Sequence, residues 1–145
     1  MIALVQRVSQ ASVDIDGARH ASIGKGLLVL VCAEPGDEAS NVSRLAQKTA
    51  KLRIFSDEMG RMNKSVLDIG GEVLVVSQFT LAADTRSGHR PSFSRAAGPA
   101  EGEAGYLAYV QALRDQGLAV QTGVLGANMQ VGLINDGPAT FWLTL

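Results

Sequence analysis

The densest apolar run in the sequence ends abruptly in polar side chains. Within residues 72–81, four apolar residues in succession are followed by Ser77, Gln78 and, after Phe79, Thr80. A valine-rich run led in by two glycines predicts a strand buried on both faces. At its end, two hydroxyls and a carboxamide lie beside backbone N–H groups that can stabilise negative charge, which makes this break a candidate site. The alternative is an ordinary strand end whose polar groups satisfy its own hydrogen bonds.

Other apolar patterns predict a mixture of strands and loops. Alternating or unbroken apolar runs predict strands at residues 2–8, 11–15, up to 23, 27–31, 118–122, 129–135 and 139–145. The polar stretch 55–64 and the long stretch 82–98, which is rich in glycine, serine and arginine, predict loops. A long loop beside the end of a buried strand is a frequent place for function.

Two segments show the three- and four-residue spacing of amphipathic helices. In residues 38–52 the apolar positions begin at Val42 and fall on one face, while three basic side chains point outward. The second helix, residues 99–116, starts with Pro99 in its first turn and ends before Gly117. Its predicted buried face consists of Tyr106, Leu107, Val110 and Leu113.

Composition indicates one globular domain, residues 1–145, since 46% of the chain is hydrophobic and 19% is charged. The N-terminal stretch lacks the pattern of a signal peptide and no apolar run is long enough to span a bilayer, so we expect a cytoplasmic protein without membrane contact. Cys32, the one cysteine, lies in an apolar run and is expected to be buried. His20 and His89 lack the paired spacing of zinc ligands, so no metal site is predicted.

A formal net charge of -1 gives no overall basic character of the kind found in proteins that bind long duplexes. Basic residues nevertheless cluster in two windows, residues 44–64 and residues 86–95, and the second holds three arginines and no acid. Either window has the charge to contact phosphates. The alternative is a solvated helix face and a charged loop.

A second feature is the turn Asp136-Gly137-Pro138 between the last two predicted strands. Proline removes a backbone donor and glycine widens the accessible conformations, so a rigid tip of this kind presents carbonyl groups. Because Asp-Gly and Gly-Pro also mark simple turns, an ordinary hairpin turn is the alternative.

Two motifs together resemble the bacterial D-aminoacyl-tRNA deacylase family. They are the segments Ser77-Gln78-Phe79-Thr80-Leu81 and Asn135-Asp136-Gly137-Pro138-Ala139-Thr140, with agreement around them along nearly the whole chain. Two departures bear on the pocket wall: Leu125 stands where Phe is usual, and Ala139 follows the Gly-Pro pair where Val is usual. The resemblance implies an α+β fold, a compact β-barrel-like antiparallel or mixed sheet with two main helices outside.

The resemblance also implies the activity and the partner. Members of the family are homodimers that hydrolyse the ester between a D-amino acid and the terminal adenosine of tRNA, and they also remove glycine from mischarged tRNA. In that family the Gly-Pro bond is cis, and the tip, here Gly137 and Pro138, enters the partner's site and rejects L-amino acids. Arg7 is implied to orient this tip, and Leu125 and Met129 are implied to take part in substrate binding.

Ser77, Gln78, Phe79 and Thr80 are implied to form the catalytic pocket, with backbone N–H groups near Phe79 and Thr80 facing the developing oxyanion. An aminoacyl ester is already activated, so positioning and oxyanion stabilisation can supply several kcal/mol without a strong base or a cofactor. Neither histidine has an evident serine or cysteine partner, so we favour attack by water helped by the 2′-hydroxyl of the substrate, with Thr80 as a positioning group or as a nucleophile. Two other classes stay open: a hydrolase of small esters, and a non-catalytic oligomerisation or binding domain.

Overall fold

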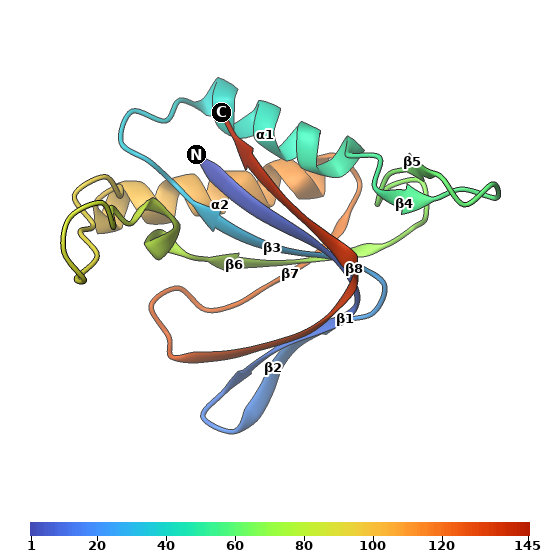
Figure 1. The fold of residues 1–145 in the computed structure, drawn as a ribbon, viewed down its shortest axis with the longest axis horizontal. Helices are drawn as coiled ribbons and strands as arrows, with labels where there is room; N and C mark the ends of the chain where they lie inside the picture. The colour runs from blue at the N-terminus through green and yellow to red at the C-terminus, as the bar shows by residue number, and fades with distance from the viewer.

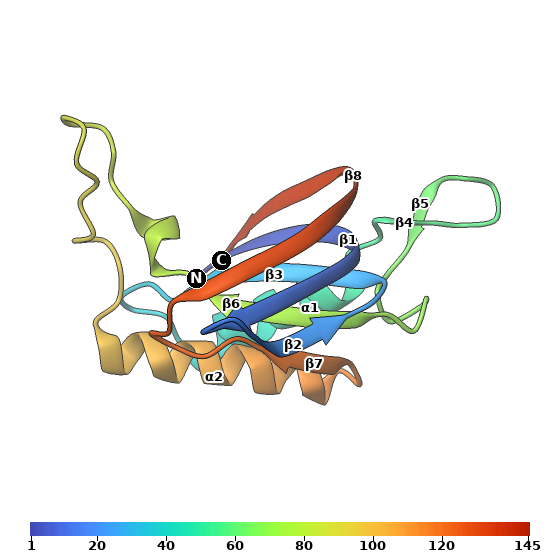
Figure 2. The same ribbon diagram turned by 90° about the horizontal axis from the view of Figure 1, so that it is seen from below.

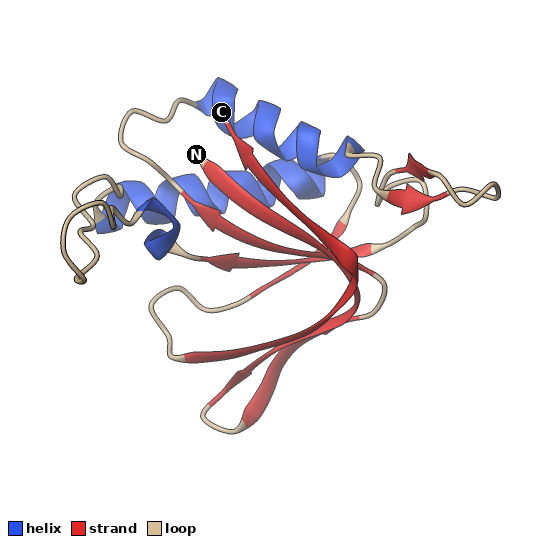
Figure 3. Cartoon of the chain, viewed as in Figure 1, coloured by secondary structure: helices blue, strands red, loops and turns tan.

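The computed structural model describes residues 1–145 as a curved sheet with two long helices packed on one of its faces (Figure 1). The strands are β1 (Ile2–Ile15), β2 (Ala18–Ile23), β3 (Gly26–Cys32), β4 (Phe55–Ser56), β5 (Met62–Lys64), β6 (Glu72–Ser77), β7 (Ala119–Thr122) and β8 (Met129–Thr144). The helices are α1 (Ala39–Lys51), the short 3-10 helix η1 (Phe79–Ala82) and α2 (Pro99–Asp115). α1 and α2 cover the same side of the sheet, which curls away from them (Figure 3).

The main sheet has the strand order β2-β1-β3-β6-β7, and β8 also pairs with β1, along the edge opposite β2 and β3. The pairs β3–β6 and β6–β7 are parallel, whereas β1 pairs antiparallel with β2, β3 and β8. The first half of β1 pairs with β3 and its second half with β2, while β8 follows β1 along both halves. This strongly curved mixed sheet with two outer helices confirms the α+β, barrel-like fold that the resemblance implies.

β6 is buried on both faces, as its apolar run predicts. Val73 and Val75 belong to the larger core, between the sheet and the two long helices. Leu74 and Val76 belong to a smaller core inside the curl of the sheet. Because successive side chains of a strand point to opposite faces, one run of four residues contributes to both cores, and the first polar side chain, Ser77, falls where the strand ends.

The helix spacing predicts the buried side of α1 correctly, since its apolar residues lie in the larger core. In α2 the prediction is wrong at Leu107, which is 55% exposed, and Tyr109 is buried instead. Tyr109 lies on the same face of α2 as Tyr106, Val110 and Leu113. Its hydroxyl lies 2.8 Å from Oγ1 of Thr49 in α1, and this hydrogen bond satisfies the polar atom inside the core.

The last two predicted strands are one continuous strand, β8, and the first two are likewise one strand, β1. β8 pairs with Val8 before the Asp-Gly-Pro segment and with Gln6 after it, so residues 136–139 bulge outward opposite Arg7. The hairpin interpretation of this segment is therefore wrong. β8 is not interrupted because β1 supplies hydrogen-bond partners on both sides of the bulge.

The polar stretch predicted as a loop contains a short hairpin, β4–β5, whose turn is shaped by the Asp57 carboxylate accepting bonds from the N–H groups of Met59 and Arg61. This hairpin and the loop of residues 83–98 project from opposite ends of the sheet (Figure 2). The loop has little regular structure, as predicted, with one isolated bridge between Asp84 and Ser92. None of the helices combines the length and hydropathy that a membrane crossing requires.

Candidate active site

β6 ends at Ser77 and the chain enters η1 two residues later, which puts the start of a helix at the end of a buried strand. The N–H group of Gln78 still donates to the Val31 carbonyl oxygen, 2.8 Å away, and so extends the pairing with β3. The first N–H groups of a helix have no partner within that helix. The backbone donors that η1 offers are therefore those of Phe79 and Thr80, the N–H groups that the family resemblance predicts at the oxyanion.

The side chains of this segment are partly or fully open to solvent. Nε2 of Gln78 donates to Oγ1 of Thr80, which is the only side-chain hydrogen bond that Thr80 makes. Phe79 is 57% exposed, and its ring meets the ring of Phe93 edge to face, with the centroids 5.1 Å apart. Because no imidazole or carboxylate bonds to the Thr80 hydroxyl, that hydroxyl has no general base in place.

Cys32 lies behind η1 and is buried, as the sequence predicts. Its Sγ is 3.6 Å from the Phe79 carbonyl oxygen. Burial, together with the nearby Glu34 carboxylate, raises the pKa of the Cys32 thiol, so the thiol stays neutral at neutral pH. The thiol is therefore a weak donor within reach of the Ala33 and Phe79 carbonyl oxygens, and it is not activated as a nucleophile.

An open hollow of about 360 Å³ lies beside η1. It is lined by residues at the end of η1, the end of β8 and the start of β1. The lining residues are Ile2, Glu34, Leu81, Ala82, Ala83, Arg95, Trp142 and Thr144. Because no other strand pairs with the outer side of β8, the hollow borders the free edge of the sheet.

Of the two residues assigned to substrate binding, Met129 lies close to the end of β6. A Cβ atom at Gly123 would be 2.6 Å from Sδ of Met129 and 3.7 Å from Cγ2 of Val76, so the Met129 side chain lies over Gly123 next to Val76. Leu125 is exposed in the turn between β7 and β8, which lies at the same end of the sheet as η1 (Figure 1). Val76 directly precedes Ser77, so Met129 is placed beside the polar segment.

The bulge of β8 is held at its base by two side chains. Arg7 donates from Nε to the Asp136 carbonyl oxygen and from Nη1 to the Ile54 carbonyl oxygen, both at 2.5 Å. Asn135 accepts a bond from the Ala139 N–H at 3.1 Å and donates to the Ala139 carbonyl oxygen at 3.0 Å, which closes the bulge. The peptide bond between Gly137 and Pro138 is cis, and both residues are exposed at its apex.

The predicted site residues fall into two groups at different places. Arg7, at the base of the bulge, is level with Leu27 near the start of β3, whereas Ser77 is level with Val31 near its end. Figure 1 accordingly shows the bend of β8 and η1 at opposite ends of the sheet. The structure therefore brings Ser77, Gln78, Phe79, Thr80 and Met129 together, with Leu125 at the same end, and leaves Arg7, Gly137 and Pro138 apart from them.

Two residues that contribute to the bulge of β8 and to the surface beside η1 are absent from the predicted site residues. Asn135 closes the bulge, and an asparagine before an Asp-Gly turn is a known side-chain-to-backbone signal. Phe93 pairs with Phe79, and its signal is that it is the one large apolar residue in a polar loop. No group of three or more His, Cys, Asp and Glu side chains is arranged to hold a metal ion.

Comparison with known proteins identifies the family. The sequence model of the family described as D-Tyr-tRNA(Tyr) deacylase matches residues 4–144. The D-aminoacyl-tRNA deacylase of Ruegeria pomeroyi is 60% identical over 145 residues and covers 100% of both chains, and that of Paracoccus denitrificans is 59% identical over 143 residues, which is 99% of this chain and 96% of the relative. A solved structure titled c-Myc DNA Unwinding Element Binding Protein has a TM-score of 0.94 at 38% identity and covers 100% of this chain and 99% of that chain. The chain therefore belongs to the D-Tyr-tRNA(Tyr) deacylase family.

Proposed function

We propose that this protein is a D-aminoacyl-tRNA deacylase, an ester hydrolase that releases the free D-amino acid and tRNA and also cleaves mischarged glycyl-tRNA. The observation that carries this proposal is the identity of about 60% with proteins of that name over the full length of both chains. The pair of backbone donors at the start of η1 supports it, because an acyl-transfer reaction needs such donors at the developing oxyanion. A tRNA substrate also supports a cytoplasmic location.

The chemistry proposed for the site needs neither metal nor covalent intermediate. Water attacks the ester carbonyl carbon, the N–H groups of Phe79 and Thr80 stabilise the oxyanion, and the bond to the ribose oxygen breaks as that oxygen takes up a proton. The neighbouring 2′-hydroxyl of the ribose assists this proton transfer. The segment from Ser77 to Thr80 positions the adenosine and the amino group, and Met129 and Leu125 line the pocket.

The assay that tests the function compares D-Tyr-tRNA, L-Tyr-tRNA and Gly-tRNA. We expect release of D-tyrosine and glycine and retention of L-tyrosine, because a side chain in the L configuration collides with the tip while hydrogen in its place does not. Deacylation of none of the three, at any enzyme concentration, would establish a binding domain instead. Equal cleavage of simple tyrosine esters would establish a general esterase.

Thr80→Ala tests whether this residue is the nucleophile. We expect the variant to keep a measurable fraction of the wild-type rate on D-Tyr-tRNA, because the backbone donors stay in place and the hydroxyl has no base beside it. Single-turnover deacylation at saturating enzyme measures this fraction. Complete loss of activity in a variant with an unchanged melting temperature would identify Thr80 as the nucleophile.

We also propose that two chains form each active site, as a homodimer. The exposed tip and η1 lie at different ends of one chain, so a tip can reach η1 only from a second chain. β8 supports this arrangement, because its unpaired edge carries exposed apolar residues, namely Val131, Leu133, Ile134 and Trp142. A partner's Gly137 and Pro138 then stand over the substrate and exclude the L side chain.

Ile134→Asp tests the dimer. Ile134 is 52% exposed on β8, and a carboxylate there must lose water if a partner covers it, so we expect the variant to dissociate and to lose deacylation in proportion. Sedimentation velocity and deacylation at the same protein concentration measure both. Leu107→Asp, an equally exposed leucine on α2, is the matched control and is expected to stay dimeric. A monomeric variant with full activity would contradict the shared site.

A further inference from the structure

The loop of residues 83–98 follows η1 directly and is held in shape by its own hydrogen bonds. The backbone groups of Asp84 and Ser92 bond to each other in both directions, at 2.7 and 2.9 Å. The Asp84 carboxylate also accepts bonds from the backbone N–H, Nε and Nη2 of Arg86, and this guanidinium holds the pKa of the carboxyl well below its usual range. The loop therefore presents a defined surface next to the candidate active site.

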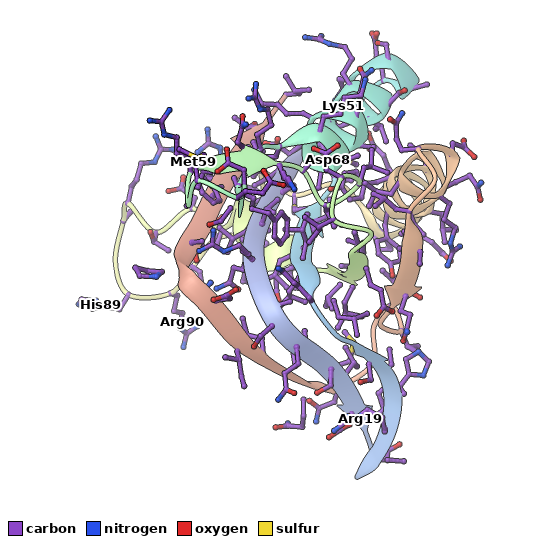
Figure 4. All side chains as sticks on the ribbon, turned by 90° about the vertical axis from the view of Figure 1, so that its right-hand side faces the viewer. Arg19, Lys51, Met59, Asp68, His89 and Arg90 are labelled. Atoms are coloured by element: carbon purple, nitrogen blue, oxygen red, sulfur yellow. The ribbon has the colours of Figure 1, made fainter.

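The charge of this surface is positive. Asp84 is the only acid in the loop and is already paired with Arg86, whereas Arg90 and Arg95 form no ion pair. Figure 4 shows His89 and Arg90 on the outer turn of the loop, away from the body of the sheet. Arg95 lines the hollow beside η1. Guanidinium groups at both places can contact phosphates along one strand of nucleic acid.

Two aromatic rings stand where this charged loop meets the site. Phe79 and Phe93 are 57% and 40% exposed, and their planes make an angle of 64°, so the pair forms an open corner. Aromatic faces exposed beside arginines are the usual means by which proteins hold unpaired bases, since every base can stack on them. One of the two rings belongs to Phe79, whose N–H group is proposed to stabilise the oxyanion formed from the ester.

We propose that the Phe79–Phe93 corner and the arginines of this loop bind the unpaired nucleotides that precede the esterified adenosine of the RNA substrate. This inference rests on the proposed function and specifies which part of that substrate the loop binds. The esterified adenosine binds against the segment from Ser77 to Thr80, so the base of the preceding nucleotide reaches Phe93, whose ring contacts that of Phe79. The phosphates that link these nucleotides then lie along Arg90 and Arg95.

The test compares two esters that differ only in these nucleotides, D-Tyr-tRNA and D-tyrosyl adenosine. Phe93→Ala removes the outer ring of the corner. We expect kcat/KM on D-Tyr-tRNA to fall about tenfold, the usual effect of deleting one base-stacking ring, and kcat/KM on D-tyrosyl adenosine to change by less than about twofold. Phe93→Tyr keeps the aromatic face and is expected to restore cleavage of D-Tyr-tRNA.

Two further variants keep the inference testable. Arg90→Ala should lower the slope of log kcat/KM against log salt on D-Tyr-tRNA by about 0.7, the value for one phosphate of a single strand, without affecting D-tyrosyl adenosine. Leu107→Ala, which removes an exposed apolar side chain elsewhere, should change neither substrate.

Three outcomes would overturn the inference. An equal loss on both substrates for Phe93→Ala would mean that the ring only supports Phe79, and no loss on either would mean that it has no role. A wild-type protein that cleaves neither ester would overturn the proposed function and this inference with it.

Discussion

Gly137→Ala is expected to lower the deacylation of D-Tyr-tRNA by about a hundredfold or more, the cost of misplacing catalytic geometry by about 1 Å. A Cβ atom at this position would collide with the backbone nitrogen of Ala139 and would lie 2.5 Å from Oδ1 of Asn135. These two atoms are the donor and the acceptor of one of the hydrogen bonds that close the bulge. The tip therefore has to change shape, and in the proposed dimer the partner's site then loses the wall proposed to select its substrate. Rates on D- and L-Tyr-tRNA measure the effect.

Gly102→Ala is the matched control for this variant. The glycine lies in α2, and the nearest atom to an added Cβ is the Ala97 carbonyl oxygen at 4.0 Å, so the methyl group fits. We expect full activity and a gain in stability of about 0.5–1 kcal/mol from the better helix former. If Gly137→Ala cleaves D-Tyr-tRNA at the wild-type rate and still spares L-Tyr-tRNA, the tip is only a bulge in a strand.

Arg7→Ala is expected to weaken both stability and selectivity. Its guanidinium is the donor to the Asp136 and Ile54 carbonyl oxygens, so the variant leaves two backbone acceptors without that partner and costs about 2 kcal/mol of unfolding free energy. The freed tip no longer holds one orientation, and we expect the ratio of D- to L-Tyr-tRNA cleavage to fall by about tenfold or more. Denaturant unfolding and the two rates, measured well below the melting temperature, report these effects.

Two substitutions frame this experiment. Arg7→Lys keeps the charge but cannot donate to both carbonyl groups in a fixed fork, so it is expected to fall between wild type and Arg7→Ala. Arg19→Ala removes an exposed arginine that pairs with Asp14 in the hairpin formed by β1 and β2 (Figure 4). We expect this variant to behave as wild type. Arg7→Ala results indistinguishable from those of Arg19→Ala would refute an orienting role.

Sequence patterns predicted those parts of the fold that depend on one segment at a time. The run from Val73 to Val76 predicts its own burial on two faces, because each side chain in it is apolar. Tyr109 has the spacing of the buried face formed by Tyr106, Val110 and Leu113, so Leu107 was the wrong choice within α2 itself. What α2 alone does not contain is the partner of the Tyr109 hydroxyl, Thr49, which lies in another helix. Likewise, the bulge at residues 136–139 looks like a turn until β1 is known to pair with both sides of it.

For the candidate site, too, the sequence predicted the residues of single segments but not the contacts between segments. The polar break after Val76 marks Ser77, Gln78 and Thr80, and the structure does place them at the end of β6. The aromatic contact between Phe79 and Phe93 joins η1 to a loop whose path is not periodic, so no pattern specifies it. The separation between Arg7 and the polar segment follows only from the strand register.

The pairing of β1 with β8 has a consequence for how the chain is made. Ile2 pairs with Thr144 and Ile15 pairs with Met129, so the first strand to be synthesised has its partner among the last residues. Contacts this distant in sequence slow folding. During translation one edge of β1 is uncovered until β8 has left the ribosome, so the nascent chain carries an unpaired, apolar edge for most of its synthesis. The residues of the tip, which lie in β8, acquire their shape only in this final step.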